Sequence, residues 1–325
     1  MRSPDAVAVK ARCLAALPGL LRAHGLDSAA KIVQDDEGWV NPCFFIGEDI
    51  VVRFNARDPE LPKFRREVVS FALARGAALP VPDVIAHDTT RRHAPYEALI
   101  VRRLPGSSLE RAWPDLDLGM QGRAARDVGE LMARLHGLHP EGFGELAIDA
   151  AARPRSWLVH CRSVMDGRLA DALREGVLDE NDARRARRIL VDREAELRGV
   201  ERASLVHGDL HFGNILQVEG RVTGVVDFEW SSAGDPDMDL VTTGVVGEIC
   251  PGSLAPLLAA YRVLRPANSD IERRLDVYRT LHNVLMCVVS TKYFPDEAAA
   301  CLVATRAQLA RASGTDSDAS PDERV

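Results

Sequence analysis

No two cysteines of the sequence have the CxxC spacing, and no histidine stands at the spacing of a metal-binding cluster. Short cysteine spacings are typical of structural zinc sites and redox-active thiols, so the sequence argues against both. We interpret the cysteines as reduced, mostly buried small hydrophobic side chains. They are scattered along the chain at Cys13, Cys43, Cys161, Cys250, Cys287 and Cys301.

Long hydrophobic runs are also missing. The longest early apolar stretch, Cys13 to Leu21, is interrupted by Pro18 and is not followed by a small-residue cleavage site, so we expect no signal peptide. No run approaches the roughly 20 apolar residues that a helix needs to cross a bilayer. We therefore expect no membrane association and a cytoplasmic location.

Positive charge is not in excess, because 41 Lys and Arg residues stand against 48 Asp and Glu residues, with a formal net charge of −7 at pH 7. Proteins that bind the phosphate backbone of nucleic acids need clustered Lys and Arg on one face. We therefore expect no nucleic-acid partner, and nothing in the sequence indicates an obligate protein partner. A cationic or neutral ligand is easier to accommodate.

The chain is long enough for two lobes, with 325 residues of which 46% are hydrophobic. Its first hundred residues predict an antiparallel sheet with one main helix, in which the first three strands form a meander, since Val-, Ile- and Phe-rich runs alternate with turn residues. The segments are an opening helix at 5–22, strands at 31–34, 43–46, 50–54, 84–87 and 96–102, and a helix at 60–76.

The pattern changes after Leu104, because the remaining residues are predicted to be almost entirely helical. A core helix is expected at 122–136 and two charged helices across 156–198, split near 176–181. One hairpin, with its turn at Glu219-Gly220, is the exception. We predict a nucleotide-binding lobe at 1–102, a catalytic and substrate-binding lobe at 103–312, and a disordered tail at 313–325.

Two segments carry the chemistry: VHGDLHFGNIL at 206–216 and VTGVVDFEW at 222–230. Phosphoryl transfer needs a carboxylate that orients the attacking hydroxyl and accepts its proton, and oxygen ligands that hold Mg²⁺ on the phosphates. Asp209 and Asn214 lie five positions apart, and Asp227 follows Asp209 by eighteen at the end of the hairpin. We predict Asp209 as the catalytic base and Asn214 and Asp227 as Mg²⁺ ligands.

These segments resemble the aminoglycoside phosphotransferase and choline kinase superfamily, whose catalytic loop reads HxDxxxxN. His207, Asp209 and Asn214 match that loop, and Asp227 begins the metal-binding triplet. The GDPxxDL segment of the family is present as Gly234 to Leu240. The resemblance implies an α+β fold like that of protein kinases, with a small antiparallel N-lobe and a larger, mostly helical C-lobe.

The resemblance also assigns supporting residues. His207 would support the catalytic loop, and Asp239 would receive hydrogen bonds from the backbone of that loop. In the N-lobe, Arg53 would hold the nucleotide phosphates, oriented by Glu67, fourteen residues on. A solvated surface ion pair is the alternative for these two residues.

The remaining nucleotide contacts are expected from two loops. The segment EGWVNPCFF at 37–45 occupies the place of a phosphate-covering loop but lacks GxGxxG. It leaves Gly38 and Asn41 as candidates, with a simple hairpin turn as the alternative. The segment from Arg102 to Leu104 would be the hinge whose backbone meets the purine.

The acceptor is expected between the catalytic loop, the charged helices and the carboxy-terminal helices. A polycationic aminoglycoside would call for acidic residues, and aromatic side chains could pack against its rings. A solvated face for the acidic residues and a buried core position for the aromatic ones are the alternatives. The candidates are Glu229, Trp157 and Trp230, with Glu248, Asp296 and Glu297 as further acidic residues.

The sequence thus predicts an enzyme that moves the γ-phosphate of ATP or GTP, with Mg²⁺, to a hydroxyl of a small molecule. An aminoglycoside or a related antibiotic is the first hypothesis for the acceptor. A metabolic acceptor such as an amino alcohol, a sugar or homoserine is the second. A nucleotide-binding regulator without catalysis is the third, against which the intact Asp209, Asn214 and Asp227 argue.

Overall fold

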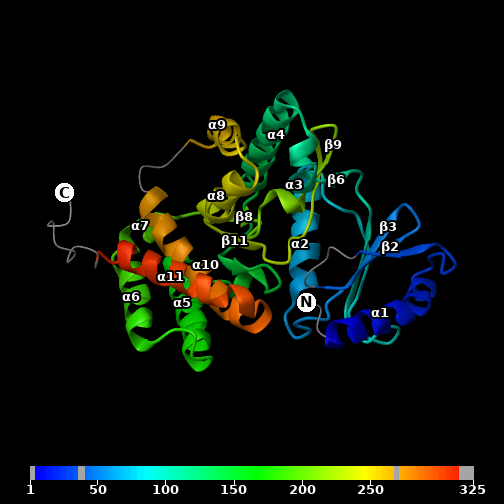
Figure 1. The fold of residues 1–325 in the computed structure, drawn as a ribbon, viewed down its shortest axis with the longest axis horizontal. Helices are drawn as coiled ribbons and strands as arrows, with labels where there is room; N and C mark the ends of the chain where they lie inside the picture. The colour runs from blue at the N-terminus through cyan, green and yellow to red at the C-terminus, as the bar shows by residue number, and fades with distance from the viewer. Residues whose placement is uncertain (1–3, 36–40, 267–270, 315–325) are drawn as a thin grey trace.

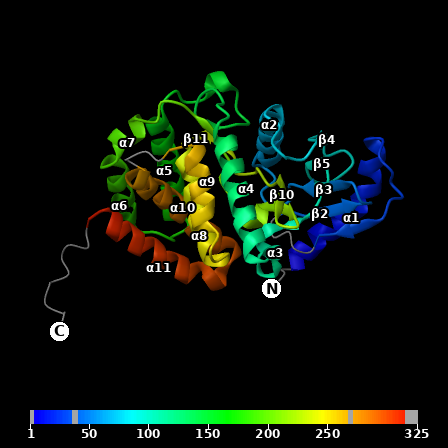
Figure 2. The same ribbon diagram turned by 90° about the horizontal axis from the view of Figure 1, so that it is seen from above.

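The computed structural model of the chain describes residues 4–35, 41–266 and 271–314. A five-stranded sheet lies at one end of the molecule and most of the helices lie at the other (Figures 1 and 2). The sheet end is built from α1 (Pro4–Ala23), β1 (Ile32–Gln34), β2 (Cys43–Ile46), β3 (Ile50–Phe54), α2 (Lys63–Gly76), β4 (Val84–Asp88) and β5 (Ala98–Arg102).

All neighbouring strands of this sheet are antiparallel, in the order β1-β2-β3-β5-β4. The meander predicted for the first three strands is confirmed, while β5 rather than β4 pairs with β3. The helix expected from residue 60 begins at Lys63 instead. Pro62 explains the difference, because the residue before a proline is pushed out of the helical conformation. Pro62 itself occupies the N-cap position.

The two faces of the sheet belong to different hydrophobic clusters, because side chains alternate across a strand. Val52 and Ile100 point towards α1, whose Leu17 packs in the same cluster. Leu99 and Phe71 belong instead to the larger cluster that fills the helical end of the molecule. The predicted boundary between the two lobes, at 102/103, therefore crosses a hydrophobic cluster to which both parts of the chain contribute. The division into lobes stays a prediction.

The second part of the chain is mostly helical, as expected, with several very short strands. It comprises β6 (Ser107–Ser108), α3 (Leu109–Ala112), α4 (Leu118–His136), β7 (Gly144–Glu145), α5 (Trp157–Arg174), α6 (Glu180–Val191), α7 (Glu194–Arg198), β8 (Ser204–Val206), β9 (Ile215–Val218), β10 (Arg221–Val225), β11 (Ser232–Gly234), α8 (Asp239–Ile249), α9 (Leu254–Leu264), α10 (Ile271–Tyr293) and α11 (Pro295–Ala312).

Residues 156–198 form three helices where two were expected. The predicted split is present, since the side chain of Asp179 caps the first turn of α6. The second break, between α6 and α7, was missed because no glycine or proline marks it. Of the tail expected at 313–325, residues 315–325 lie outside the described part of the chain.

Two three-stranded sheets, in the orders β10-β9-β6 and β7-β11-β8, hold the segment between β8 and β10. The hairpin β9–β10 is present, and its turn residues Glu219 and Gly220 both have positive φ angles of 50° and 71°. Strand β8 leads directly into the loop that begins at His207. In the described residues, no helix has the length and apolar content to cross a membrane.

Helix α4 packs closely against α9, and this packing depends on Gly129. A methyl group at Gly129 would overlap the carbonyl oxygen of Leu257. We expect Gly129→Ala to lower the free energy of unfolding by about 2 kcal/mol, since overpacking a core forces the backbone to shift. Urea denaturation measures this change.

Gly122 on the same helix provides the matched control. A methyl group there would meet only the Arg126 guanidinium, at 3.5 Å. Gly122→Ala should therefore raise stability by up to about 1 kcal/mol, the difference in helix propensity between the two residues. An equal gain in stability for both variants would contradict the close packing of α4 on α9.

Candidate active site

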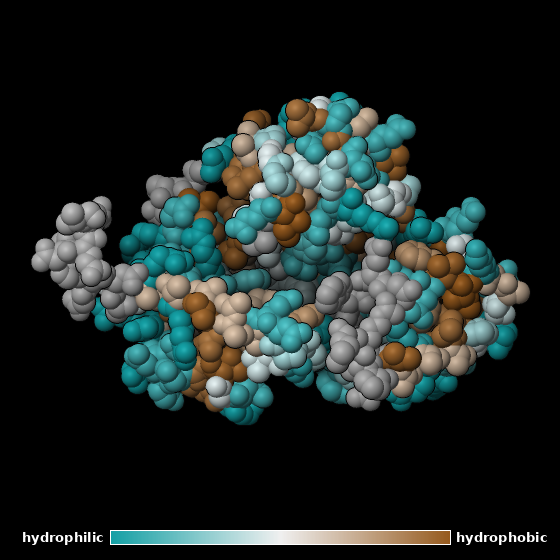
Figure 3. Space-filling view, viewed as in Figure 1, coloured by the Kyte–Doolittle hydropathy of each residue, from teal (hydrophilic) through white to brown (hydrophobic). Residues whose placement is uncertain are grey.

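The surface is hollowed between the helical end and the sheet end, and hydrophilic side chains line much of this hollow (Figure 3). The loop that follows β8 lies between the same two parts of the molecule (Figure 1). The carboxylate of Asp239, at the start of α8, fixes the backbone of this loop. Asp239 accepts hydrogen bonds from the backbone N–H groups of His207 (2.9 Å) and Gly208 (2.7 Å). This is the contact that the resemblance implied.

The imidazole of His136 on α4 also binds the Asp239 carboxylate, at 2.9 Å. The side chains of Asp239, His136 and His207 are all buried. Burial alone would raise the pKa of Asp239, but the hydrogen bond and charge of His136 outweigh it and hold this pKa below its usual range. The loop is thus tied to a fixed charge in the core.

Gly208 and His207 set the path of the loop. Gly208 has a φ of 82°, and a side chain there would collide with the carbonyl of Trp230, so only glycine fits. His207 donates from Nε2 to the Val226 carbonyl (3.0 Å) and accepts at Nδ1 from the Asp209 amide (3.3 Å). The buried imidazole therefore joins the catalytic loop to the end of β10.

The carboxylate of Asp209 is partly exposed and held by its neighbours. Asn214 donates from Nδ2 to the backbone carbonyl of Asp209 (2.9 Å) and to its Oδ2 (3.3 Å). The ring of His211 lies 3.7 Å from the same oxygen. Burial would raise the pKa of Asp209, but the contact with His211 and the nearby charges outweigh it, so the pKa lies below its usual value. Asp209 is therefore ionised at neutral pH.

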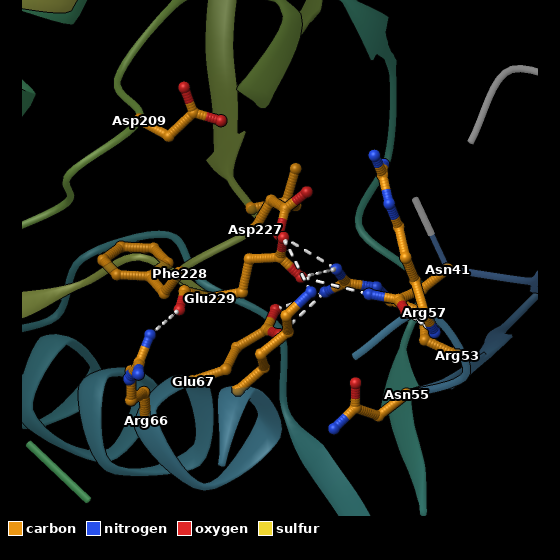
Figure 4. A network of polar contacts seen from close by, with 12 residues as sticks. Asn41, Arg53, Asn55, Arg57, Arg66, Glu67, Asp209, Asp227, Phe228 and Glu229 are labelled. Atoms are coloured by element: carbon orange, nitrogen blue, oxygen red, sulfur yellow. Dashed lines mark hydrogen bonds and ion pairs between the residues drawn. The ribbon is translucent and has the colours of Figure 1, made fainter. Parts of the chain in front are cut away.

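Asp227 comes next to Asn214 because the hairpin returns it there. The amide of Val226 donates to the Asn214 carbonyl at 3.0 Å, directly after the β9–β10 ladder ends. Asp227 has a φ of 65°, a left-handed conformation that few residues other than glycine adopt. Its side chain turns towards Arg53, which donates to Oδ1 at 2.9 Å (Figure 4).

Arg53 and Glu67 form a buried ion pair. Arg53 Nη1 donates to both oxygens of Glu67, at 2.6 and 2.8 Å, and the two side chains are 16% and 1% exposed. The alternative of a solvated surface pair is therefore wrong. Glu67 and Asp227 converge on the same guanidinium, with Glu229 beside them (Figure 4).

Glu229, predicted as a substrate residue, is buried at 4% exposure in this network, so its burial does not favour that prediction. It accepts a hydrogen bond from Asn41 (3.1 Å) and lies 3.9 Å from both Arg53 and Lys63. Asn41 also accepts from the amides of residues 56 and 57. These bonds hold the side chain of Asn41 within the network, and the phosphate contact predicted for Asn41 stays a prediction.

The network carries more negative than positive groups. Three carboxylates, of Glu67, Asp227 and Glu229, share the cations Arg53 and Lys63. Burial raises the pKa of Glu67 to about 8, with Asp227 and Glu229 adding to the rise. A divalent cation beside Asp227 would relieve the repulsion between these carboxylates.

The donor set fits Mg²⁺ only in part. No group of three or more His, Cys, Asp or Glu side chains forms a metal site in the residues that the structure covers. Asn214 and Asp227 offer one amide oxygen and one carboxylate, and Mg²⁺ commonly takes one or two protein ligands together with substrate phosphates. These residues fit an ion that arrives with a nucleotide.

The other residues predicted to contact the substrate or the nucleotide lie in different environments. Trp157 is 1% exposed and donates to the Tyr278 hydroxyl at 2.8 Å, which is the buried core position given as the alternative to a substrate role. Trp230 is partly exposed and remains a candidate. The amides of Arg102 and Arg103 donate to the carbonyls of Asp83 and Asp49, both at 2.8 Å, so within the predicted hinge segment only the amide of Leu104 is a candidate donor to the purine. Gly38 lies outside the described residues.

Three features of the site were not expected from the sequence. Arg66 on α2 donates to the Glu229 carbonyl (3.0 Å) and pairs with Glu145, and so connects the metal-binding triplet to β7. His211 contacts Asp209 at 3.7 Å. The HxDxxxxN pattern contains His211 at a variable position, which is why only the structure identifies it.

The third feature is a contact between the β3–α2 loop and the end of α10. The hydroxyl of Tyr293 donates to Asp58 at 2.8 Å, and the guanidinium of Arg57 lies 3.4 Å from the centre of the Tyr293 ring. Asp58 also contacts Lys63 at 3.4 Å, which leads to Glu229. The two ends of the molecule are thus joined beside the network.

A cavity of about 460 Å³ lies elsewhere, between the β11–α8 segment, α9 and α10, and Tyr261, Arg262 and Arg274 are among its lining residues. None of the residues of the catalytic loop lines it. We treat the surroundings of Asp209 as the candidate active site, because the groups predicted for phosphoryl transfer converge there and not at the cavity.

Known proteins resemble this chain in sequence and in fold. A protein of Vibrio cholerae serotype O1 described as "Probable ketoamine kinase" is 24% identical over 253 residues, covering 75% of this chain and 82% of that protein. A ternary complex of a thermostable mutant of aminoglycoside phosphotransferase APH(4)-Ia with ADP and hygromycin B superimposes with a TM-score of 0.65, at 20% identity over 90% of this chain and 97% of that one.

The GDP complex of a mutant of aminoglycoside 2′-phosphotransferase IIIa gives a TM-score of 0.68, at 20% identity over 94% of this chain and all of that one. At this identity the likeness establishes the fold, which is the kinase-like α+β fold expected. The sequence model of the phosphotransferase enzyme family, APH, matches residues 31–278. Since this match spans well over half of the sequence, the chain belongs to the APH phosphotransferase family.

Proposed function

We propose that the protein transfers the γ-phosphoryl group of a nucleoside triphosphate to a hydroxyl group of a small molecule. The observation that carries this proposal is the ionised carboxylate of Asp209, held by Asn214 in a loop whose backbone is fixed, with Asp227 returned to its side by the hairpin. This arrangement suits phosphoryl transfer, in which the protein positions the reactants and stabilises charge.

In the proposed reaction, Asp209 orients the acceptor hydroxyl and takes its proton while the new P–O bond forms and the bond to the nucleoside diphosphate breaks. Asn214 and Asp227 would hold Mg²⁺, which when bound neutralises phosphate charge. Arg53, kept in place by Glu67, would reach the phosphates with the guanidinium that now binds Asp227.

We propose ATP as the donor and keep GTP as the alternative, since complexes of similar structures contain ADP in one case and GDP in another. The backbone near Leu104 would meet the purine. We also propose that the protein acts in the cytoplasm, where its six free cysteines would stay reduced.

Two acceptor classes are supported by similar proteins. The aminoglycoside hypothesis draws on the structures of aminoglycoside phosphotransferases, and the metabolic hypothesis on the relative described as a ketoamine kinase. The burial of Glu229 removes one acidic group from the first hypothesis. Glu248, Asp296 and Glu297 are exposed and keep it open. A turnover screen against both classes distinguishes them.

Replacing the predicted base tests the chemistry. Asp209→Asn keeps the size of the side chain but cannot take the hydroxyl proton, so we expect kcat to fall by about 100-fold or more. Binding of the Mg²⁺–nucleotide, measured by calorimetry, should persist. Asp166→Asn is the control, since that residue is exposed on α5. Unchanged turnover in Asp209→Asn would refute this role.

Removing the predicted metal ligand should affect a different step. Asp227→Ala deletes one of the two oxygen ligands and frees Arg53 from an ion pair. We expect weaker binding of the nucleotide in the presence of Mg²⁺ and a smaller change in its absence. Calorimetric titration with and without Mg²⁺ measures both values. An equal loss under the two conditions would argue against a metal role for Asp227.

The acid limit of the reaction should depend on His211. Burial raises the pKa of Asp209, and the contact with His211 lowers it. His211→Gln removes the lowering effect of the imidazole, so the pKa of Asp209 should rise. The acid limb of the profile of kcat/KM against pH should therefore move to higher pH. His24→Gln, which changes a histidine on the remote α1 end, should leave the limb in place. A shift to lower pH in His211→Gln would contradict the assignment.

A further inference from the structure

The cavity of about 460 Å³ lies at the helical end of the molecule, where α8, α9 and α10 come together (Figures 1 and 2). Leu240 of α8 and Leu258 of α9 contribute an apolar wall. A smaller cavity of about 300 Å³ adjoins it, since His139, Glu201 and Arg202 line both. Small-molecule sites have volumes of about 300 to 1,000 Å³. The space is therefore large enough for a small organic ligand.

The buried acidic side chains of the cavity lining already have partners within the protein. Arg274 of α10 approaches Asp235 with its Nε at 2.8 Å, and it also pairs with Asp237. The hydroxyl of Tyr278 donates to the same Asp235 carboxylate at 2.6 Å. Asp235 and Asp237 are thus held by this internal network and do not pair with the other cations of the lining.

Three further arginines line the cavity: Arg202, which precedes β8, and Arg262 and Arg265, at the end of α9. None of the three forms an ion pair with a carboxylate in the part of the chain that the structure describes. Arg202 and Arg262 are exposed and Arg265 is half-buried, so this part of the lining faces solvent. Glu201 is the acidic residue of the lining that lies beside them, so three positive charges face one negative charge.

This arginine group suits a phosphate monoester. Such a group carries a charge of about −1.5 to −2 at neutral pH and has three acceptor oxygens. The excess of the three arginines over Glu201 is two positive charges. A guanidinium binds phosphate oxygens with two parallel hydrogen bonds. The apolar wall beside the arginines would take the organic part of the molecule, so the lining favours an organic phosphate.

One wall of the cavity continues into the anchor of the catalytic loop. The hydroxyl of Tyr261, a lining residue, lies 3.0 Å from Nδ1 of His136, whose Nε2 binds Asp239. Asp239 accepts the backbone N–H groups of the catalytic loop. Asp237 of the lining precedes Asp239 in the same segment. A ligand that binds one arrangement of this wall more tightly would therefore act on the catalytic loop.

We propose that the cavity is a second binding site, which takes an organic phosphate as a regulatory ligand. The phosphate group binds the three arginines, and the organic part packs against the apolar wall. No residue of the catalytic loop from His207 to Asn214 lines the cavity, so this ligand is distinct from the acceptor of the proposed reaction. Nucleotide and regulatory ligand then change each other's affinity by the same factor.

Pairs of probes that differ only in the phosphate group test the site. Suitable pairs are glucose 6-phosphate with glucose, and AMP with adenosine. Binding to the full chain is measured by calorimetry in the presence of Mg²⁺ and saturating AMP-PNP, so that the nucleotide site is filled. In at least one pair, we expect the phosphorylated member to bind at least about tenfold more tightly, the effect of charge-assisted hydrogen bonds.

Variants of the lining locate the binding. Arg262→Gln and Arg265→Gln should each weaken binding of the phosphorylated probe about tenfold and leave its unphosphorylated partner unchanged. Leu258→Trp, which fills the cavity, should weaken both members of the pair. Arg184→Gln is the matched control, because Arg184 is exposed on α6 and lines neither cavity. Thermal unfolding of each variant without ligand checks that the fold is retained.

The connection to the catalytic loop is tested through the affinity for AMP-PNP with Mg²⁺. A saturating phosphorylated probe should change this affinity about fivefold or more, and AMP-PNP should change the affinity for the probe by the same factor. Tyr261→Phe removes the hydroxyl that contacts His136. It should reduce this factor while the probe still binds.

Several results would overturn the inference. Equal binding of both members in both pairs would do so, as would an equal loss of affinity in Arg184→Gln and Arg262→Gln. Complete exclusion of the probe by AMP-PNP would place the phosphate in the active site instead. An AMP-PNP affinity that does not respond to the probe would contradict the regulatory role. A lack of phosphoryl transfer with every acceptor would refute the proposed function and leave this second site standing.

Discussion

The buried carboxylate of Asp239 is the contact on which the geometry of the site depends. It lies at the start of α8, receives two backbone N–H groups of the catalytic loop and is held by His136 of α4. Three elements that are distant in the sequence are thus fixed to one charge in the core. Removing that charge would leave two buried donors without an acceptor, which costs far more than the average hydrogen bond contributes.

From this anchor, a series of polar contacts crosses to the sheet end of the molecule. His207 binds the carbonyl before Asp227, Asp227 binds Arg53, and Arg53 binds Glu67 on α2. Each side chain is positioned by the preceding one. The relative placement of the proposed base, metal ligands and phosphate-binding arginine therefore depends on the packing of both ends of the chain against each other.

Much of this could be predicted from the sequence, because the determining signals are local. The strands 43–46 and 50–54 follow from runs of Val, Ile and Phe between turn residues, and the hairpin follows from Glu219-Gly220. The intervals between Asp209, Asn214 and Asp227 can be taken directly from the sequence. The strands β6, β7 and β11 were missed because two or three residues show no period.

The direction of a side chain could not be predicted in this way. Trp157 and Glu229 are chemically suitable for a substrate, but tertiary packing turns one into the core and the other towards Asn41.

The left-handed backbone of Asp227 has a consequence for how this protein can evolve. Of the side chains that resemble aspartate, asparagine tolerates such a φ angle best, and a single nucleotide change converts one codon to the other. The most accessible change at this position is thus to a neutral amide that preserves the loop and weakens the proposed cation site. A lineage of this family could lose its chemistry in one mutational step and retain a folded scaffold for another use.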